Sequence, residues 1–327
     1  MAKPIKNTRS YIIFFTTAAA VLAIWTFYIF ENELLSLFID YWFMTIVMVF
    51  GSFIAGASSE GGGAIAYPVM TLFFNIEPDV ARNFSFAVQS FGMTFAAFWI
   101  FLSKIKIEKT YLFTAGIGGL TGIILGSWFI APYVPSSYAK MMFVSFWLSF
   151  GIALWVVNFV QKRESVESLP TLTAGQKTEL LLVGVAGGIF SSILGNGLDI
   201  CTFAYVILKY GLSEKVATPT SVILMASNAI AGFLIHAFVL ESMQTEAINY
   251  LLVCIPVVIF GAPLGAFTIN KIGRKPIASI LFAIIVIQFL SALFIIKPGF
   301  LLLIFSFGVF MTGVILFFIL ASNHKQS

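Results

Sequence analysis

Charged residues are scarce in this chain. They make up 10% of its 327 residues, against about 25% in a soluble domain. Hydrophobic residues make up 60%, and no polar stretch is long enough to fold as a separate soluble domain. The net charge of +4 does not indicate a nucleic-acid partner, because the positive residues stand in short segments between apolar runs, where they orient a membrane protein.

Residues suited to metal binding and redox chemistry are also few. Cys201 and Cys254 are the two cysteines, and both lie in apolar segments, where we expect small core side chains. The two histidines, His236 and His324, are far apart, and no metal-ligand spacing occurs. The chain also lacks a Gly-x-x-x-x-Gly-Lys-[Ser/Thr] loop for nucleotide phosphates. We therefore expect no cofactor, no metal and no nucleotide-driven reaction.

Long apolar runs dominate what is present. A membrane-spanning helix needs about 20 apolar residues, and such runs recur along the chain. They are Tyr11–Phe30, Val80–Leu102, Tyr111–Ala131, Tyr138–Val160, Lys215–Leu240, Ala247–Ile269, Ile277–Ile296 and Phe300–Ala321. We predict an all-α polytopic membrane protein in a lipid bilayer. The first run lacks small residues for cleavage at its end, so we expect a retained anchor helix and not a signal peptide.

Two polar breaks interrupt other apolar stretches. The first is Ser58-Ser59-Glu60-Gly61-Gly62-Gly63, and the second is Gly195-Asn196-Gly197-Leu198-Asp199. Glycines weaken a helix, and a carboxylate is costly in hydrocarbon. A membrane tolerates such a break only where the backbone is buried in protein or lines a wet cavity. Paired breaks in corresponding positions point to a transporter site.

The breaks belong to two weakly similar halves. A shift of 136 residues aligns Gly51 with Gly187, Gly61 with Gly197, Val80-Ala81 with Val216-Ala217 and Ser85 with Ser221, and a shift of 139 aligns Gly122 with Gly261 and Gly126 with Gly265. The predicted division is an N-terminal cytoplasmic tail and anchor helix (1–40), a first repeat (41–160), a cytoplasmic linker (161–177), a second repeat (178–297) and a C-terminal transmembrane helix and tail (298–327).

Positive charge favours one topology over another. If each broken segment crosses the membrane once, 11 Lys and Arg residues lie inside and 7 outside. If each is a re-entrant hairpin with arms of about 14 to 17 residues, 15 lie inside and 3 outside, which fits the positive-inside rule better. The favoured fold thus has two inverted repeats, each a broken re-entrant helix hairpin plus three transmembrane helices, with an extra helix at each terminus. A single crossing by each broken segment stays open.

Anion binding is the chemistry that the breaks suggest. A helix N-terminus attracts anions without a lysine or arginine, and Ser, Thr and Asn side chains add donors. The candidate substrate-binding residues are Ser58, Ser59, Gly61, Gly62, Gly63, Arg82, Asn83, Ser191, Ser192, Asn196, Gly197, Thr218, Thr220 and Ser221. Two alternatives remain: the glycines permit close helix packing, and Arg82 pairs with Glu77 or Asp79 near the membrane surface.

Glu60 and Asp199 are the acidic residues deepest in the pattern. Carboxylates inside a membrane commonly bind and release protons in coupled carriers, so both are candidates for proton coupling. The alternative is that each is a helix cap or part of an ion pair. Asp199 is placed to cap its own helix.

The duplicated motif resembles the TauE/SafE-type (TSUP) family of sulfite and organosulfonate transporters. The resemblance rests on Ser59-Glu60-Gly61-Gly62-Gly63 with Pro68 and Val80-Ala81, on Gly195-Asn196-Gly197-Leu198-Asp199 with Val216-Ala217-Thr218-Pro219-Thr220-Ser221, and it runs from about Trp42 to Ile296. It implies a carrier of small, often sulfur-containing anions, with about eight crossings in two repeats, in a prokaryotic inner membrane.

We therefore expect a proton-coupled secondary transporter that moves a small oxyanion by alternating access. Sulfite or a short organosulfonate is the first choice and a short carboxylate the second; an anion channel is a further alternative. An enzyme is not expected, because no nucleophile has a placed histidine. Nucleic acid is not an expected partner, and a homodimer is compatible with the sequence.

Overall fold

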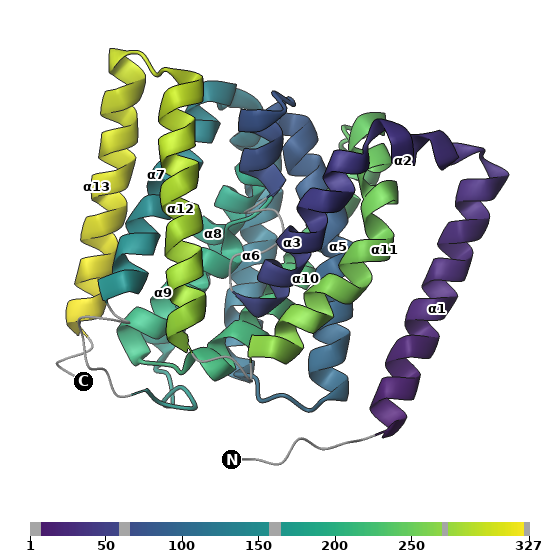
Figure 1. Ribbon diagram of the computed structural model, residues 1–327. Coiled ribbons are helices and arrows are strands. Elements are labelled where there is room, and N and C mark those ends of the chain that lie inside the picture. The colour runs from purple at the N-terminus through teal and green to yellow at the C-terminus, as the bar shows by residue number, and fades with distance from the viewer. Residues whose placement is uncertain (1–7, 59–65, 157–164, 270–273, 324–327) are drawn as a thin grey trace.

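The computed structural model describes residues 8–58, 66–156, 165–269 and 274–323, and in these ranges the chain is helical, with one isolated β-bridge between Val166 and Leu212. The helices are α1 (Thr8–Glu31), η1 (Leu34–Ser36), α2 (Leu37–Asp40), α3 (Trp42–Ala57), η2 (Val69–Phe73), α5 (Pro78–Leu102), α6 (Lys109–Phe129), η3 (Ala131–Tyr133), α7 (Ser136–Trp155), α8 (Ala174–Leu194), α9 (Leu198–Tyr210), α10 (Glu214–Leu234), η5 (Ile235–Val239), α11 (Thr245–Ile269), α12 (Arg274–Ile296) and α13 (Phe300–Asn323). The predicted all-α class is confirmed (Figure 1).

Seven helices in the described part of the chain are long and apolar enough to cross a membrane, or eight if the bent pair α2 and α3 counts as one span. Those seven comprise α8 and six of the predicted runs, which form α1, α5, α6, α10, α11 and α13. The other two predicted runs form α7 and α12. The protein is therefore a multi-pass membrane protein.

Each broken segment starts and ends at the same end of the bundle. Phe43 at the start of α3 stacks on Phe74 just after η2, with ring centroids 4.2 Å apart. Glu179 near the start of α8 forms an ion pair with Lys209 near the end of α9. Arms α3 and α9 have 16 and 13 residues, but α8 has 21, so the predicted arm length is wrong for α8.

The two segments open at opposite ends. The carbonyl of Thr71 in η2 accepts a hydrogen bond of 3.2 Å from Lys140 at the start of α7. The chain before α8 instead contacts the connection from α5 to α6, through the 3.1 Å ion pair of Lys106 with Glu167. These connections lie at opposite ends of α6, with the start of α1 and the end of α13 both at the lower side of Figure 1.

Glycine contacts hold one half of the chain against the other. A Cβ on Gly122 of α6 would lie 2.1 Å from the carbonyl oxygen of Val185 in α8. A Cβ on Gly265 of α11 would lie 2.1 Å from the carbonyl oxygen of Phe53 in α3. Small residues let membrane helices approach this closely. The glycines of α6 therefore contact the broken segment of the second half, and those of α11 contact the broken segment of the first half.

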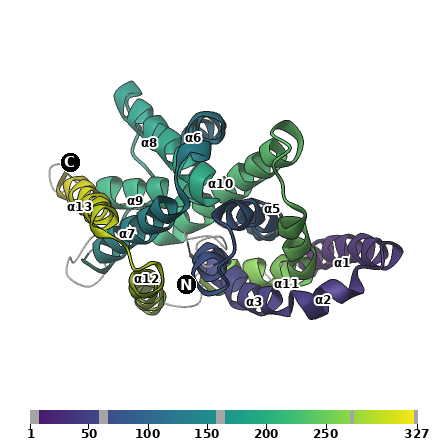
Figure 2. The same cartoon turned by 90° about the horizontal axis from the view of Figure 1, so that it is seen from above.

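Helices α5 and α10 occupy the centre of the bundle (Figure 2). Of the residues in the apolar stretch of each helix, 67% are buried in α5 and 56% in α10, whereas only 17% are buried in α1 and 22% in α13. Helix α5 opens with Pro78 at its first turn and Asp79 beside it, which suit the fixed backbone angle and the positive end of a helix. The polar residues of these two central helices therefore lie deep in the molecule.

Candidate functional site

The turn between α8 and α9 is the best-defined break in the described chain. Gly195 ends α8 in the left-handed conformation, with φ of 75°, and its amide donates a 2.7 Å hydrogen bond to the carbonyl of Ser191. Only glycine adopts this conformation without strain. Helix α9 then begins at Leu198, and the whole turn is buried.

The first turns of α5 cover this break. A Cβ on Gly195 would lie 2.6 Å from the Cβ of Ser85 and 2.7 Å from the carbonyl oxygen of Arg82. Gln89 donates hydrogen bonds to the carbonyls of Gly195 and Ser85, at 3.0 and 2.9 Å. A Cβ on Gly197 would likewise meet Phe190 at 2.7 Å. Both glycines therefore lie in close contact with their neighbours, as in the alternative in which glycine permits close helix packing.

The amides at the start of α9 already have acceptors. The amide of Leu198 donates to the hydroxyl of Ser191 at 3.0 Å, and that of Gly197 to Oδ1 of Asp199 at 3.3 Å. Two side chains of the same hairpin therefore cap these amides. Asp199 is 1% exposed, and its second oxygen, Oδ2, has no hydrogen-bond partner in the described part of the chain.

Asp199 lies among further buried polar groups. The hydroxyl of Tyr111, on α6, and that of Thr202 are 2.9 Å apart, and Thr202 donates to the carbonyl of Leu198. The sequence interpretation missed both side chains. Thr202 stands three residues after Asp199, on the same helix face, which is a signal that could have found it; Tyr111 carries no such signal.

The other described candidate residues of α8, the turn and α10 are buried. Ser192 donates to the carbonyl of Ile189 at 2.7 Å and packs on Gly126 of α6. Thr220 donates to the carbonyl of Val216 and accepts from the amide of Glu108, at 2.7 and 2.9 Å. The remaining ones, also buried, are Asn196, Thr218 and Ser221.

Arg82 and Asn83 form a polar network at the start of α5. Arg82 pairs with Asp79 at 3.0 Å, as the alternative interpretation held, and also donates to the side chain of Asn83 at 3.1 Å. Asn83 donates to the carbonyl of Ser242 and the side chain of Gln244, both at 2.8 Å.

The same network reaches the end of η5. The hydroxyl of Ser242 is 2.8 Å from Nδ1 of His236, a buried histidine whose ring stacks on Phe86 with centroids 5.7 Å apart. Asn83 therefore ties α5 to the connection between α10 and α11. Arg82 donates to Asn83, and its backbone packs against Gly195 of the turn.

The first break lies mostly outside the described residues. That holds for Ser59, Glu60, Gly61, Gly62 and Gly63. Ser58 is buried, at 4% exposure, and donates to the carbonyl of Ile54 at 2.8 Å. Among the residues that the structure describes, no group of three His, Cys, Asp or Glu side chains is arranged to hold a metal ion.

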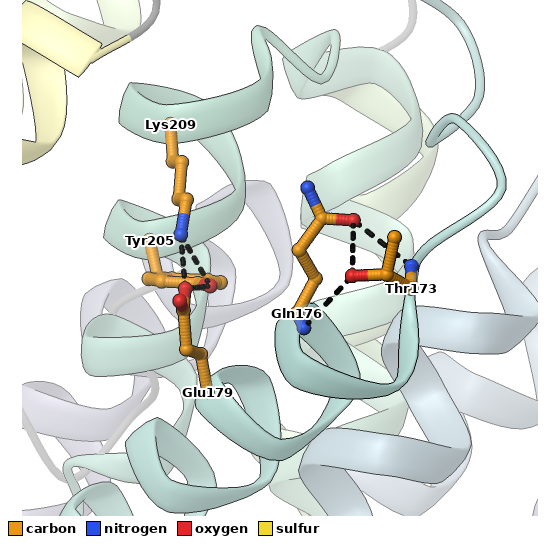
Figure 3. Close-up of polar contacts among 5 residues, drawn as sticks. All are labelled: Thr173, Gln176, Glu179, Tyr205 and Lys209. Carbon is orange, nitrogen blue, oxygen red and sulfur yellow. Dashed lines mark hydrogen bonds and ion pairs between the residues drawn. The ribbon is translucent and has the colours of Figure 1, made fainter.

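The open end of the second hairpin is held by polar contacts at the bundle surface (Figure 3). Glu179 accepts hydrogen bonds from Lys209 and, at 2.8 Å, from the hydroxyl of Tyr205. Thr173 and Gln176 form a capping box that starts α8, with reciprocal bonds of 2.9 and 3.3 Å. These contacts fix both ends of the hairpin and leave the turn at its buried tip.

Comparison with known proteins returned one family. A family model described as "Sulfite exporter TauE/SafE" matches residues 43–294. No curated protein and no solved structure matches the chain. The matched range covers both broken segments and every helix from α3 to α11.

Proposed function

This chain belongs to the TauE/SafE sulfite exporter family, and on that premise we propose that it moves sulfite or a short organosulfonate by alternating access. The family consists of membrane transporters for sulfite-type anions. The choice of oxyanion, the coupling to protons and the conformational cycle are the proposal. In this proposal the buried turn between α8 and α9 forms the centre of the transport site.

The placement of Asp199 carries this proposal. Its carboxylate sits where an anion would sit at a helix N-terminus, bonded to the amide of Gly197, with Oδ2 unpartnered. Helix N-termini stabilise negative charge through the helix dipole and exposed amides. A substrate oxyanion and the Asp199 side chain therefore compete for the same donors.

This competition links proton binding to anion binding. Two negative charges about 4 Å apart repel by about 4 kcal/mol at an effective dielectric constant of about 20, and this repulsion weakens substrate binding while Asp199 is ionised. Protonation of Asp199 removes the repulsion and releases the Gly197 amide to the oxyanion. One proton then accompanies each substrate bound at this turn, and Glu60 serves the first break in the same way.

Helix α5 must move for substrate to reach the turn. Gln89 and Ser85 seal Gly195 in the structure. The side chains of Ser191, Ser192, Asn196, Thr218, Thr220 and Ser221 would line the site once α5 withdraws. Arg82, beside the turn, would meet the oxyanion on the way in, since its guanidinium forms a fork that suits such groups.

The re-entrant topology fits the hairpins that open at opposite ends. Cysteines in place of Lys106 and Ser165 should both be protected from an impermeant reagent added outside, whereas a cysteine in place of Ser136, at the other end of the bundle, should react. Labelling of Lys106→Cys or Ser165→Cys from outside would refute this orientation.

Counterflow in proteoliposomes tests the transport function. Vesicles loaded with unlabelled sulfite or taurine should accumulate the labelled anion transiently, because a carrier exchanges substrate across alternating states. A short carboxylate should compete weakly if the oxyanion assignment is right. Equal flux with and without internal substrate would indicate a channel, and no exchange of any tested anion would refute the proposal.

A further inference from the structure

An apolar groove lies between α1 and the rest of the bundle, far from the turn. It has a volume of about 260 Å³ and is lined by aromatic and aliphatic side chains. Those that define it are Tyr11 and Phe15 of α1, Trp99 of α5, and Leu264 and Phe267 of α11. The transport mechanism uses none of them.

Helix α1 forms one wall of the groove while keeping few contacts with the bundle. It stands at the edge, beside α11 (Figure 1 and Figure 2). At its start Ser10 donates to the carbonyl of Leu102 at 3.0 Å, and further along Trp25 donates to the carbonyl of Leu252 at 2.9 Å. The groove lies beside the first of these attachments, in the first two turns of α1.

Two cations stand at the end of the groove. Arg9 precedes Ser10, and Lys104 follows Leu102 by two residues, so the Ser10–Leu102 hydrogen bond brings them to one end of the bundle. Both are exposed, and neither forms an ion pair within the parts of the chain that the structure describes. Phe15 lies about 9 Å along the helix axis from Arg9, at 1.5 Å per residue.

We propose that this groove binds an anionic phospholipid, with one acyl chain between α1 and α11 and the phosphate beside Arg9 and Lys104. Basic residues next to apolar surface at the cytoplasmic face select anionic headgroups, and the N-terminal end of α1 is cytoplasmic in the proposed topology.

Native mass spectrometry of the full chain tests this assignment. Detergent-purified protein is supplied with phosphatidylglycerol or phosphatidylethanolamine, and retained lipid is counted. Wild type should retain phosphatidylglycerol preferentially. Each cation near an anionic headgroup contributes about 1 kcal/mol, which is about 5-fold in affinity. The double variant Arg9→Gln with Lys104→Gln should therefore weaken phosphatidylglycerol retention about 30-fold. Lys177→Gln, another exposed cation, is the matched control and should change nothing.

A groove-filling variant separates the acyl chain from the charge. Leu264→Trp should lower retention of both lipids, whereas Phe307→Trp on exposed α13 should not. Equal retention of the two lipids by wild type, or an unchanged double variant, would overturn the proposal. Loss of a dimer in Leu264→Trp without any change in lipid retention would overturn it in favour of an interface between copies.

Discussion

Replacing Gly122 by Ala should destabilise the protein, although alanine is the better helix former. The new Cβ would lie 2.1 Å from the Val185 carbonyl oxygen and 3.0 Å from the Gly188 Cα. Ordinary contact needs about 3.5 Å, so this pair of atoms must separate by about 1.4 Å. A gap of 0.5–1 Å already forfeits about a quarter to a half of each dispersion contact.

The expected loss exceeds the helix-propensity gain. Overpacking costs about 1–3 kcal/mol, and it acts here on rigid backbone, while Gly→Ala in a helix returns at most about 1 kcal/mol. In a chain of this size 1 kcal/mol moves the melting temperature by about 2 °C. Gly265→Ala, which meets the Phe53 carbonyl at the same 2.1 Å, should behave alike.

Heating the detergent-solubilised protein while following tryptophan fluorescence measures this effect, since the chain has six tryptophans. Gly308→Ala in α13 is the control, because nothing lies within 4 Å of its new Cβ. We expect the control to match or exceed wild type. The reasoning is refuted if Gly122→Ala melts no lower than Gly308→Ala at the same heating rate.

Three further predictions concern polar contacts. Gln89→Leu leaves the buried Gly195 carbonyl without its donor, and we expect a loss of about 1–3 kcal/mol with slower transport; unchanged melting and flux would contradict this. Asn83→Ala cuts two 2.8 Å bonds to the α10–α11 connection, so hydrogen exchange should rise there, and equal exchange would argue against the network. Glu179→Gln breaks an exposed ion pair with Lys209 and should cost at most about 1 kcal/mol, which a fall in melting temperature of more than about 5 °C would disprove.

The sequence predicted the membrane fold because apolar runs of spanning length are an unambiguous signal. It also located the turn, since glycine at Gly195 and a carboxylate at Asp199 stand out in hydrocarbon. It did not reveal that α5 seals the turn, because the contact between Ser85 and Gly195 joins positions 110 residues apart. Helix α8 is longer than the predicted arm because it begins at Ala174, inside the predicted linker, where the polar residues of its first turns carry no apolar signal.

The pairing of matched glycines with the opposite half was likewise beyond the sequence. Gly122 and Gly261 align, but alignment does not say what they touch. The structure places Gly122 against Val185 and Gly261 against Ser52. Helix α6 therefore packs on the broken segment of the second half, and helix α11 packs on the broken segment of the first half.

Proton flux through wild type and Asp199→Asn in proteoliposomes tests the central claim most directly. An inward sulfite gradient imposed on vesicles containing a pH-sensitive dye should acidify the lumen with wild type. Asp199→Asn should retain counterflow of labelled sulfite, because the amide side chain adds no charge, but should lose the acidification that depends on this residue. Acidification of equal size in the variant, at equal sulfite flux, would contradict the role assigned to Asp199.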